Sequence, residues 1–211
     1  MYRTSQCWAL VIALTGLWLV SHGQTVEAAE PEELIRQMLT RLTAVLTDNT
    51  LQDPAQRQVR HQRVAQVVAP SFDFAEMARR SLAQYWHRLT PAQQGEFVQI
   101  FSDLVLQSLV ERIVSRTRTV GYGSVPNAIQ YTRETIDPAG DASVQTAMTY
   151  AHEQTTEEIE YLLLRRNGTW MVYDVVTEGS SMVTNYRAQF ALVIRQESYD
   201  DLLKRLKASR P

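Results

Sequence analysis

The sequence predicts an α+β fold in which N-terminal helices are followed by a curved four-stranded antiparallel sheet and then by two C-terminal helices. Two observations predict this order. Apolar residues recur with helical spacing before about residue 118 and after about residue 181, whereas residues 128–177 alternate with the period typical of strands. Asn167-Gly168, between two alternating runs, is a strong signal for a tight β-hairpin. Because helices and strands are segregated along the chain, we expect them to pack as separate layers.

The first 28 residues have the pattern of a secretory signal peptide. A positively charged start precedes an apolar run from Trp8 to Val20, and small residues suit cleavage after Ala28. The alternative, an uncleaved anchor, is disfavoured because this run is too short for an ordinary membrane span. We therefore expect residues 1–28 to be removed on export and residues 29–211 to form a single α+β domain.

Composition argues against several kinds of chemistry. The formal net charge of −2 gives no global basic field, so we expect no nucleic-acid partner. The only cysteine, Cys7, lies in the expected signal peptide, which leaves the mature chain without disulfides or thiolate ligands. His61, His87 and His152 lack the spacing of metal ligands, and no glycine-rich phosphate loop or Gly-x-Ser-x-Gly elbow is present. We expect no metal, no cofactor and no catalytic residues.

Four helices are expected before the sheet. The first runs from Glu32 to about Thr47 and carries an apolar stripe. The second opens at Asp53-Pro54, because Asp caps a helix and Pro fits its first position. The third opens at Asp73, which forms a capping-box pattern with Glu76. The fourth runs from Thr90 to about Arg118 and is apolar over much of its girth, which indicates burial on more than one side.

Four strands are expected at residues 128–136, 142–152, 157–166 and 170–177. The last strand is apolar on both faces and is therefore expected to be covered on both. Glu178-Gly179-Ser180-Ser181 is expected to turn the chain into an amphipathic helix, with Ser as the cap. A short last helix is expected to start at Ser198.

We interpret the surplus of inward apolar residues as the wall of a cavity for a lipid. Tyrosines support this hypothesis, because a Tyr ring is apolar while its hydroxyl can lie at a wet boundary. The residues expected to contact the lipid lie on the fourth helix, on the strands and on the helix after the turn. They are Phe101, Leu104, Val105, Met148, Tyr150, Tyr161, Leu163, Val172, Asp174, Val176, Met182, Tyr186, Arg187 and Phe190.

Two charged residues in this set have alternative interpretations. Asp174 would be a candidate general base if its face of the strand lined a cavity. The favoured interpretation is a carboxylate paired with Arg or capped by backbone amides, because no second catalytic group converges with it in the sequence. Arg187 is a candidate partner for Asp174 or for a lipid phosphate, and a solvated surface Arg is the alternative.

Two blocks of residues resemble the signature of the MlaC family, and together they span essentially the whole mature chain. The N-terminal block is Phe72-Asp73-Phe74, Leu82, Trp86, Leu89-Thr90, Gln94, Phe97 and Phe101. The C-terminal block is Trp170, Val172-Tyr173-Asp174-Val175, Glu178-Gly179, Ser181, Asn185-Tyr186-Arg187 and Gln189-Phe190. The chain departs from the family pattern at Ala83, where Gly is usual, and at Ser180, where Val is usual.

The resemblance implies a periplasmic phospholipid carrier, of the kind also described as an auxiliary component of toluene tolerance. It implies a cone-like sheet wrapped by helices, with the acyl tails inside. Its implied partners are an inner-membrane ABC-type lipid transporter with a substrate-binding ring and an outer-membrane lipoprotein complex. Lipid shuttled between them would maintain the lipid asymmetry of the outer membrane, and we expect the carrier to be a monomer.

Three alternatives remain open from the sequence. The first is a carrier of the same family that accompanies hopanoid synthesis and takes a different cargo. The second is a small-molecule enzyme on a similar fold that uses Asp174 as its base. The third is a structural periplasmic adaptor with a filled core.

Overall fold

The computed structural model describes residues 30–119, 125–150 and 154–209, so the predicted signal peptide lies outside the described part of the chain. The helices are α1 (Pro31–Thr47), α2 (Arg57–Val68), α3 (Phe74–Leu82), α4 (Pro91–Thr119), α5 (Met182–Gln196) and α6 (Tyr199–Ala208). The strands are β1 (Ala128–Ile136), β2 (Ala142–Tyr150), β3 (Thr155–Arg166), β4 (Thr169–Thr177) and β5 (Ser180–Ser181). Short 3₁₀ helices are η1 (Asn49–Leu51), η2 (Pro54–Gln56), η3 (Ala69–Ser71) and η4 (Ala83–Arg88). No helix among these residues has the combination of length and hydropathy needed to cross a bilayer.

The predicted α+β arrangement is confirmed, but the sheet has five strands in the described residues instead of the predicted four. They form an antiparallel meander in the order β1-β2-β3-β4-β5. The extra strand, β5, pairs Ser180 and Ser181 with Thr177 and Val176. A strand of two residues has no alternation to detect, and Ser181 is also the cap of the next helix. The sequence therefore showed only the turn.

Two tight turns in the sheet follow from their residues. Asn167 and Gly168, between β3 and β4, have positive φ angles of 51° and 84°. Glu178 and Gly179, between β4 and β5, have φ angles of 51° and 73°. Positive φ at both central positions is the conformation that lets a two-residue turn match the twist of its strands. The predicted Asn-Gly hairpin is thus confirmed.

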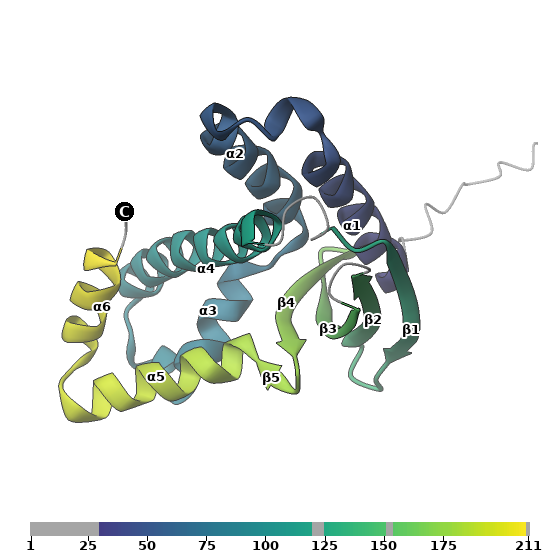
Figure 1. Ribbon diagram of the computed structural model, residues 1–211. Coiled ribbons are helices and arrows are strands. Elements are labelled where there is room, and N and C mark those ends of the chain that lie inside the picture. The colour runs from purple at the N-terminus through teal and green to yellow at the C-terminus, as the bar shows by residue number, and fades with distance from the viewer. Residues whose placement is uncertain (1–29, 120–124, 151–153, 210–211) are drawn as a thin grey trace, which may run out of the picture.

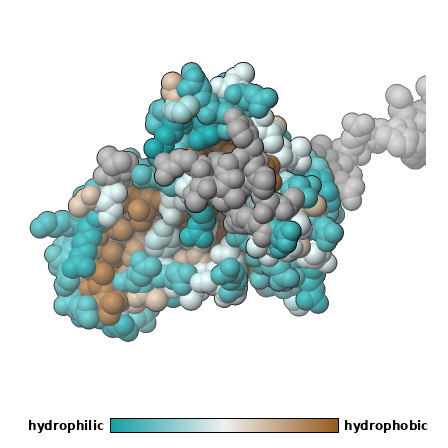
Figure 2. All heavy atoms as spheres, in the orientation of Figure 1, coloured by the Kyte–Doolittle hydropathy of each residue, from teal (hydrophilic) through white to brown (hydrophobic). Residues whose placement is uncertain are grey.

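Helices α2, α3, α5 and α6 are grouped around α4, and the curved sheet stands beside this group with α1 over it (Figure 1). Contacts of α4 with α2, α3 and α6 explain the wide apolar girth predicted for it. Its buried apolar residues are Phe97, Ile100, Phe101, Val105, Leu109, Val110 and Val114. The region where α4, α5 and α6 meet shows as an apolar band on the face drawn in Figure 2.

The start of α3 is anchored to β4. The backbone N–H of Asp73 donates to the carbonyl of Val172 at 2.8 Å, and Phe72 forms a parallel bridge with Val172. The Asp73 carboxylate accepts from the N–H of Glu76 at 2.9 Å, which confirms one half of the predicted capping box. The other half does not form, because the Glu76 carboxylate instead binds Arg79 and Arg80.

Helix α1 contacts β1 and β2, and its first turn is held by the sheet. The N–H of Glu32 donates to the Glu134 carboxylate at 2.7 Å, so a residue of β1 satisfies a free amide at the helix start. The guanidinium of Arg36 lies 3.9 Å from the centre of the Tyr131 ring. Strand β1 is the outer edge of the sheet, and its pairing with β2 is interrupted by a bulge between Tyr131 and Arg133.

Candidate functional site

A cavity of about 500 Å³ lies between the sheet and helices α1, α4 and α5. This volume is typical of ligand pockets, and it far exceeds the roughly 30 Å³ that one water molecule occupies. Most of the wall is aliphatic or aromatic. The apolar lining consists of Met38, Leu39, Leu42, Leu46, Val68, Phe72, Leu109, Ile113, Pro126, Ile129, Met148, Ile159, Val175 and Met182, together with the rings of Tyr150, Tyr161 and Tyr186.

The deep wall comes from the sheet. Met148 and Tyr150 of β2, Tyr161 of β3 and Val175 of β4 all line the cavity and are buried. Burial raises the pKa of Tyr161 far above its usual range, although a hydrogen bond with Thr146 opposes this effect. The Tyr161 hydroxyl is therefore neutral at any physiological pH and adds no charge to this wall.

The mouth of the cavity lies between α4 and the β5–α5 segment. Four lining residues there are exposed to solvent, namely Arg112 of α4, Ser180 of β5, and Asn185 and Gln189 of α5. The side-chain amide of Asn185 donates to the Ser180 hydroxyl at 3.0 Å, which ties the start of α5 to β5. An apolar interior with a polar opening fits an amphiphile better than a wholly polar ligand.

Tyr186 stands between the interior and this mouth. Its ring packs at 5.2 Å from that of Phe101 and at 5.5 Å from that of Phe190. Burial raises the pKa of Tyr186, and hydrogen bonding with Ser108 and the positive charge of Arg112 both oppose that rise. Ser108 and Arg112 are one turn apart on α4 and therefore share a face of that helix.

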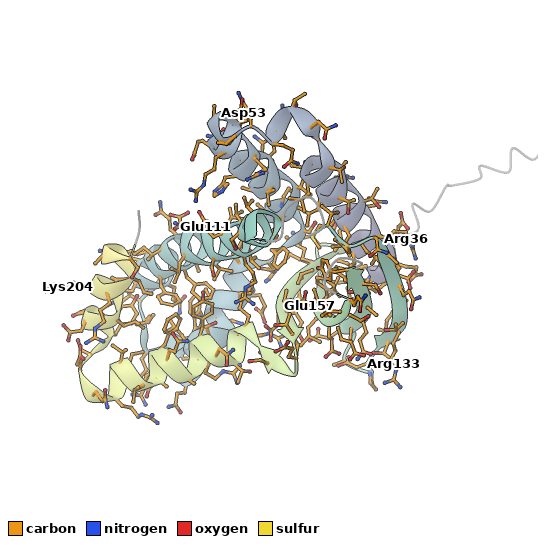
Figure 3. All side chains as sticks on the ribbon, viewed as in Figure 1. Arg36, Asp53, Glu111, Arg133, Glu157 and Lys204 are labelled. Atoms are coloured by element: carbon orange, nitrogen blue, oxygen red, sulfur yellow. The ribbon has the colours of Figure 1, made fainter. Side chains whose placement is uncertain are left out.

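The cavity has two charged lining residues among those described, Arg112 and Glu157. Glu157 belongs to β3 and is labelled beside the strands in Figure 3. Glu111, the neighbour of Arg112, points instead toward α2, where it lies 3.4 Å from the Nδ1 atom of His61. No group of three or more His, Cys, Asp or Glu residues in the described part of the chain is arranged to hold a metal.

Comparison with known families gives a match to the model described as MlaC protein, over residues 36–208. The chain belongs to the MlaC family. It is also similar in fold to a solved structure, that of the phospholipid-binding protein from Ralstonia solanacearum in complex with a phospholipid. The TM-score is 0.67 at 20% sequence identity, and the match covers 85% of this chain and 96% of that one. Comparison with curated protein sequences found no match.

In this MlaC-family chain, five of the residues predicted to contact lipid line the cavity: Met148, Tyr150, Tyr161, Met182 and Tyr186. These five lie on the sides of their strands and of α5 that border the cavity. The other nine predicted residues are not part of the lining. They are Phe101, Leu104, Val105, Leu163, Val172, Asp174, Val176, Arg187 and Phe190.

The predicted residues of α4 pack below the cavity, against other helices. Phe101 and Phe190 lie 5.9 Å apart in an edge-on arrangement and are almost fully buried. Val105 is fully buried and Leu104 is half-buried against the same core. These residues hold α5 to α4, whereas the next turns of α4, Ser108 to Ile113, reach the cavity.

The alternation of β4 shifts at Tyr173, where its pairing with β3 is irregular, so the end of the strand turns the opposite face to the cavity from the one predicted. Val175 and Thr177 line it, and Asp174 and Val176 lie on the other side of the sheet. Val172 pairs with Leu163 on the same side as Val175, but it lies outside the lining. Both faces are covered, since all residues from Val172 to Val175 are buried. A strand buried on both sides carries no alternation in polarity, so its sequence does not indicate which face borders the cavity. Leu163, which pairs with Val172 across β3 and β4, is likewise fully buried and does not line it.

Asp174 holds the start of α5. Its carboxylate accepts from the N–H groups of Val175 at 2.9 Å and Val183 at 3.0 Å, and from the Ser181 hydroxyl at 2.5 Å. Ser181 in turn accepts from the N–H of Thr184. This agrees with the favoured sequence interpretation of a carboxylate capped by backbone amides. Arg187 does not pair with Asp174, because its Nε atom donates to the carbonyl of Arg80 at 3.0 Å.

The lining residues missed from the sequence come from every wall of the cavity, and they include five residues of α1 and the exposed polar residues of the mouth. The apolar stripe of α1 was recognised, and its period gave the inward face of that helix. No sequence signal showed that this face borders a cavity and not a filled core. The polar mouth residues, such as Arg112 and Gln189, have the same spacing as solvated surface residues.

Proposed function

We propose that this MlaC-family protein is a lipid carrier that encloses the acyl chains of a phospholipid in the cavity between its sheet and helices. The observation that carries the proposal is the contrast within one cavity of about 500 Å³: an apolar, largely buried interior and an exposed polar mouth. The phospholipid bound by the structurally similar Ralstonia solanacearum protein supports it. The lipid tails would lie against Met148, Tyr161 and Val175, with the head group near Arg112.

The affinity of such a carrier would come from its tails. Burying one CH₂ group contributes roughly 0.8 kcal/mol, so two long acyl chains contribute up to about 20 kcal/mol relative to water. A bound lipid would therefore not leave spontaneously for the aqueous phase. Release needs an acceptor that offers the tails another apolar site or that binds a more open form of the protein.

We further propose that the carrier works in the periplasm, between the two membranes. The signal-peptide pattern of residues 1–28 supports export. Family membership supports an inner-membrane ABC-type transporter with a substrate-binding ring and an outer-membrane lipoprotein complex as the partners. Lipid passed between these complexes would serve the asymmetry of the outer membrane.

The enzyme alternative is less well supported. Its proposed base, Asp174, lies on the face of β4 that points away from the cavity, and its oxygens accept three hydrogen bonds, two of which come from the start of α5. A structural adaptor would need a filled core, which a cavity of about 500 Å³ does not favour. The hopanoid alternative differs only in cargo, so it is separated by the mass of the bound lipid.

Native mass spectrometry of the protein purified from bacterial cells tests the proposal. We expect a population whose mass exceeds that of the polypeptide by one phospholipid, and we expect the extra mass to be lost on denaturation. A phosphorus-free polycyclic lipid in its place would identify a hopanoid carrier. Bare polypeptide, even after incubation with phospholipid vesicles, would contradict the carrier proposal and favour the adaptor.

Transfer is tested separately from binding. Donor vesicles carrying a fluorescent phospholipid are mixed with unlabelled acceptor vesicles, and the protein is expected to accelerate exchange in proportion to its concentration. A protein that holds lipid but leaves the exchange rate unchanged would be a lipid store and not a carrier. Vesicles that contain the purified membrane partners would then show whether transfer depends on them.

A further inference from the structure

Arg112 is unusually placed for a surface arginine. It is exposed, yet it lines the cavity at the mouth formed by α4 and α5. The preceding residue, Glu111, faces α2 and lies 3.8 Å from Arg57 and 3.4 Å from His61. Since successive helical residues point about 100° apart, Arg112 is directed away from that ion-pair cluster and toward the cavity.

No carboxylate of the described residues lies within ion-pair distance of Arg112. Glu157, the acidic residue of the lining, is on β3 and forms no ion pair with it. The charge of Arg112 does act on its surroundings, because it opposes the rise in the pKa of the Tyr186 hydroxyl. Arg112 and Tyr186 both line the cavity, and the described part of the chain provides no carboxylate partner for the guanidinium.

The other polar groups at the mouth are uncharged. Ser108 and Tyr186 contribute hydroxyls, and Asn185 and Gln189 contribute amides. A guanidinium presents a planar fork of N–H donors that matches the oxygens of a phosphate, and hydroxyls and amides complete such a site as neutral donors. An amphiphile with its tails in the apolar interior has its head group at this level.

We infer that Arg112 binds the phosphodiester of a glycerophospholipid and so selects a phosphate-bearing cargo over a neutral one. This inference rests on the proposed carrier function and adds the position and chemistry of the head-group site. It also separates the candidate cargoes, since a hopanoid without phosphate has nothing for Arg112 to bind.

The test compares two lipids that share their tails. Delipidated protein is titrated with dioleoyl phosphatidylethanolamine and with dioleoylglycerol, and binding is followed by displacement of a fluorescent fatty-acid probe. The wild-type protein is expected to bind the phospholipid about tenfold more tightly than dioleoylglycerol. A charge-assisted hydrogen bond at a partly exposed site has an effect of about this size. R112Q is expected to lose this preference by weakening phospholipid binding while leaving dioleoylglycerol binding unchanged.

R187Q is the matched control, because Arg187 is also an exposed arginine and lies on α5, but its side chain binds the Arg80 carbonyl of α3 and does not line the cavity. It is expected to leave both affinities unchanged. R112K retains the charge and is expected to keep most of the preference. This variant also checks that the fold tolerates substitution at this position.

Equal wild-type affinities for the two lipids, or an equal loss of both in R112Q, would overturn the inference and leave the carrier proposal intact. A wild-type protein that binds neither lipid would overturn both.

Discussion

Ala83 ends α3 with a φ of 49° and a ψ of −119°, a combination that glycine adopts readily and alanine does not. The family pattern that this chain resembles usually has glycine at this position. The family pattern alone gives no physical reason for a glycine at this position. The backbone supplies one, because the chain must reverse between α3 and η4 with a positive φ.

We expect A83G to stabilise the protein by about 1 kcal/mol. The backbone strain of a non-glycine residue at such angles costs about 1–3 kcal/mol, and the extra entropy of glycine in the unfolded chain offsets part of the gain. Urea unfolding followed by circular dichroism measures the difference. A65G in the interior of α2 is the control and should destabilise by about 1 kcal/mol. A loss of stability in A83G would contradict the strained conformation.

The D174N substitution distinguishes a structural role of this carboxylate from a catalytic one. In D174N one oxygen remains to accept from the amides, but the charge at the start of α5 is lost. We expect the free energy of unfolding to fall by about 1–2 kcal/mol while bound lipid is retained. Denaturant unfolding and lipid extraction from the same preparation measure the two effects. A stable D174N protein without lipid would show that the carboxylate serves the ligand and not the helix.

At the scale of elements, ion pairs lock α3 to the sheet. Arg166 of β3 lies 2.6 Å from Asp73, and Arg80 of α3 lies 3.3 Å from Asp141 in the turn before β2. The guanidinium of Arg80 also covers the Tyr173 ring at 3.7 Å. At the centre of this network, the hydrogen bond from Arg79 holds the pKa of Glu76 down to about 2, although burial opposes the shift.

This network makes stability depend on pH in a defined direction. Because the pKa of Glu76 is lower in the folded than in the unfolded state, its contribution is fully present above about pH 5 and is lost as the pH falls toward 2. We expect E76Q to cost about 2 kcal/mol at pH 7, and the gap to the wild type to close near pH 2. Unfolding curves across this pH range measure it.

Glu96 provides the control for this experiment. It pairs with Lys207 at 2.7 Å, but both side chains are about half exposed. Exposed ion pairs contribute little, so E96Q should change stability by less than about 1 kcal/mol at any pH in the range. A gap between E76Q and wild type that persists at pH 2 would mean that the cost comes from packing and not from charge.

The sequence predicted most of these elements, because their signals are local. The start of α3 was predicted by Asp73, and the β3–β4 hairpin by Asn167-Gly168. Strand β5 was missed since two residues carry no period. The irregular pairing at Tyr173 shifts the alternation of β4, and a strand that is apolar on both faces gives no sign of such a shift. Pairings such as Glu134 with the start of α1 join residues about a hundred positions apart, and a single sequence contains no local signal for them.

At the scale of the whole molecule, the cavity is built from segments that are far apart in the chain. Its walls take residues from Met38 in α1 to Gln189 in α5. Apolar patterning shows which faces of the elements turn inward. The volume left between those faces depends on the distances among the sheet and helices α1, α4 and α5. For this reason the sequence led to the hypothesis of a cavity and to part of its wall, while the mouth came only from the structure.

Filling the cavity should remove lipid without unfolding the protein. We expect L42W to lower bound phospholipid several-fold, because Leu42 lines the cavity from α1 and an indole would occupy the volume of the tails. Phosphorus analysis of the purified variants measures occupancy, and circular dichroism checks the fold. L34W is matched to it, because Leu34 is a half-buried leucine of the same helix outside the lining. Equal occupancy in L42W and L34W would place the lipid elsewhere.

The outer edge of the sheet has a consequence for solution behaviour. A free strand edge invites another chain to extend the sheet, which is a route to cross-β aggregation. On β1 the bulge between Tyr131 and Arg133 twists the edge, and Arg133 lies at the outer side of the sheet (Figure 3). We therefore expect the protein to sediment as a monomer, and R133I combined with T135I to self-associate and scatter light at concentrations where the wild type remains clear.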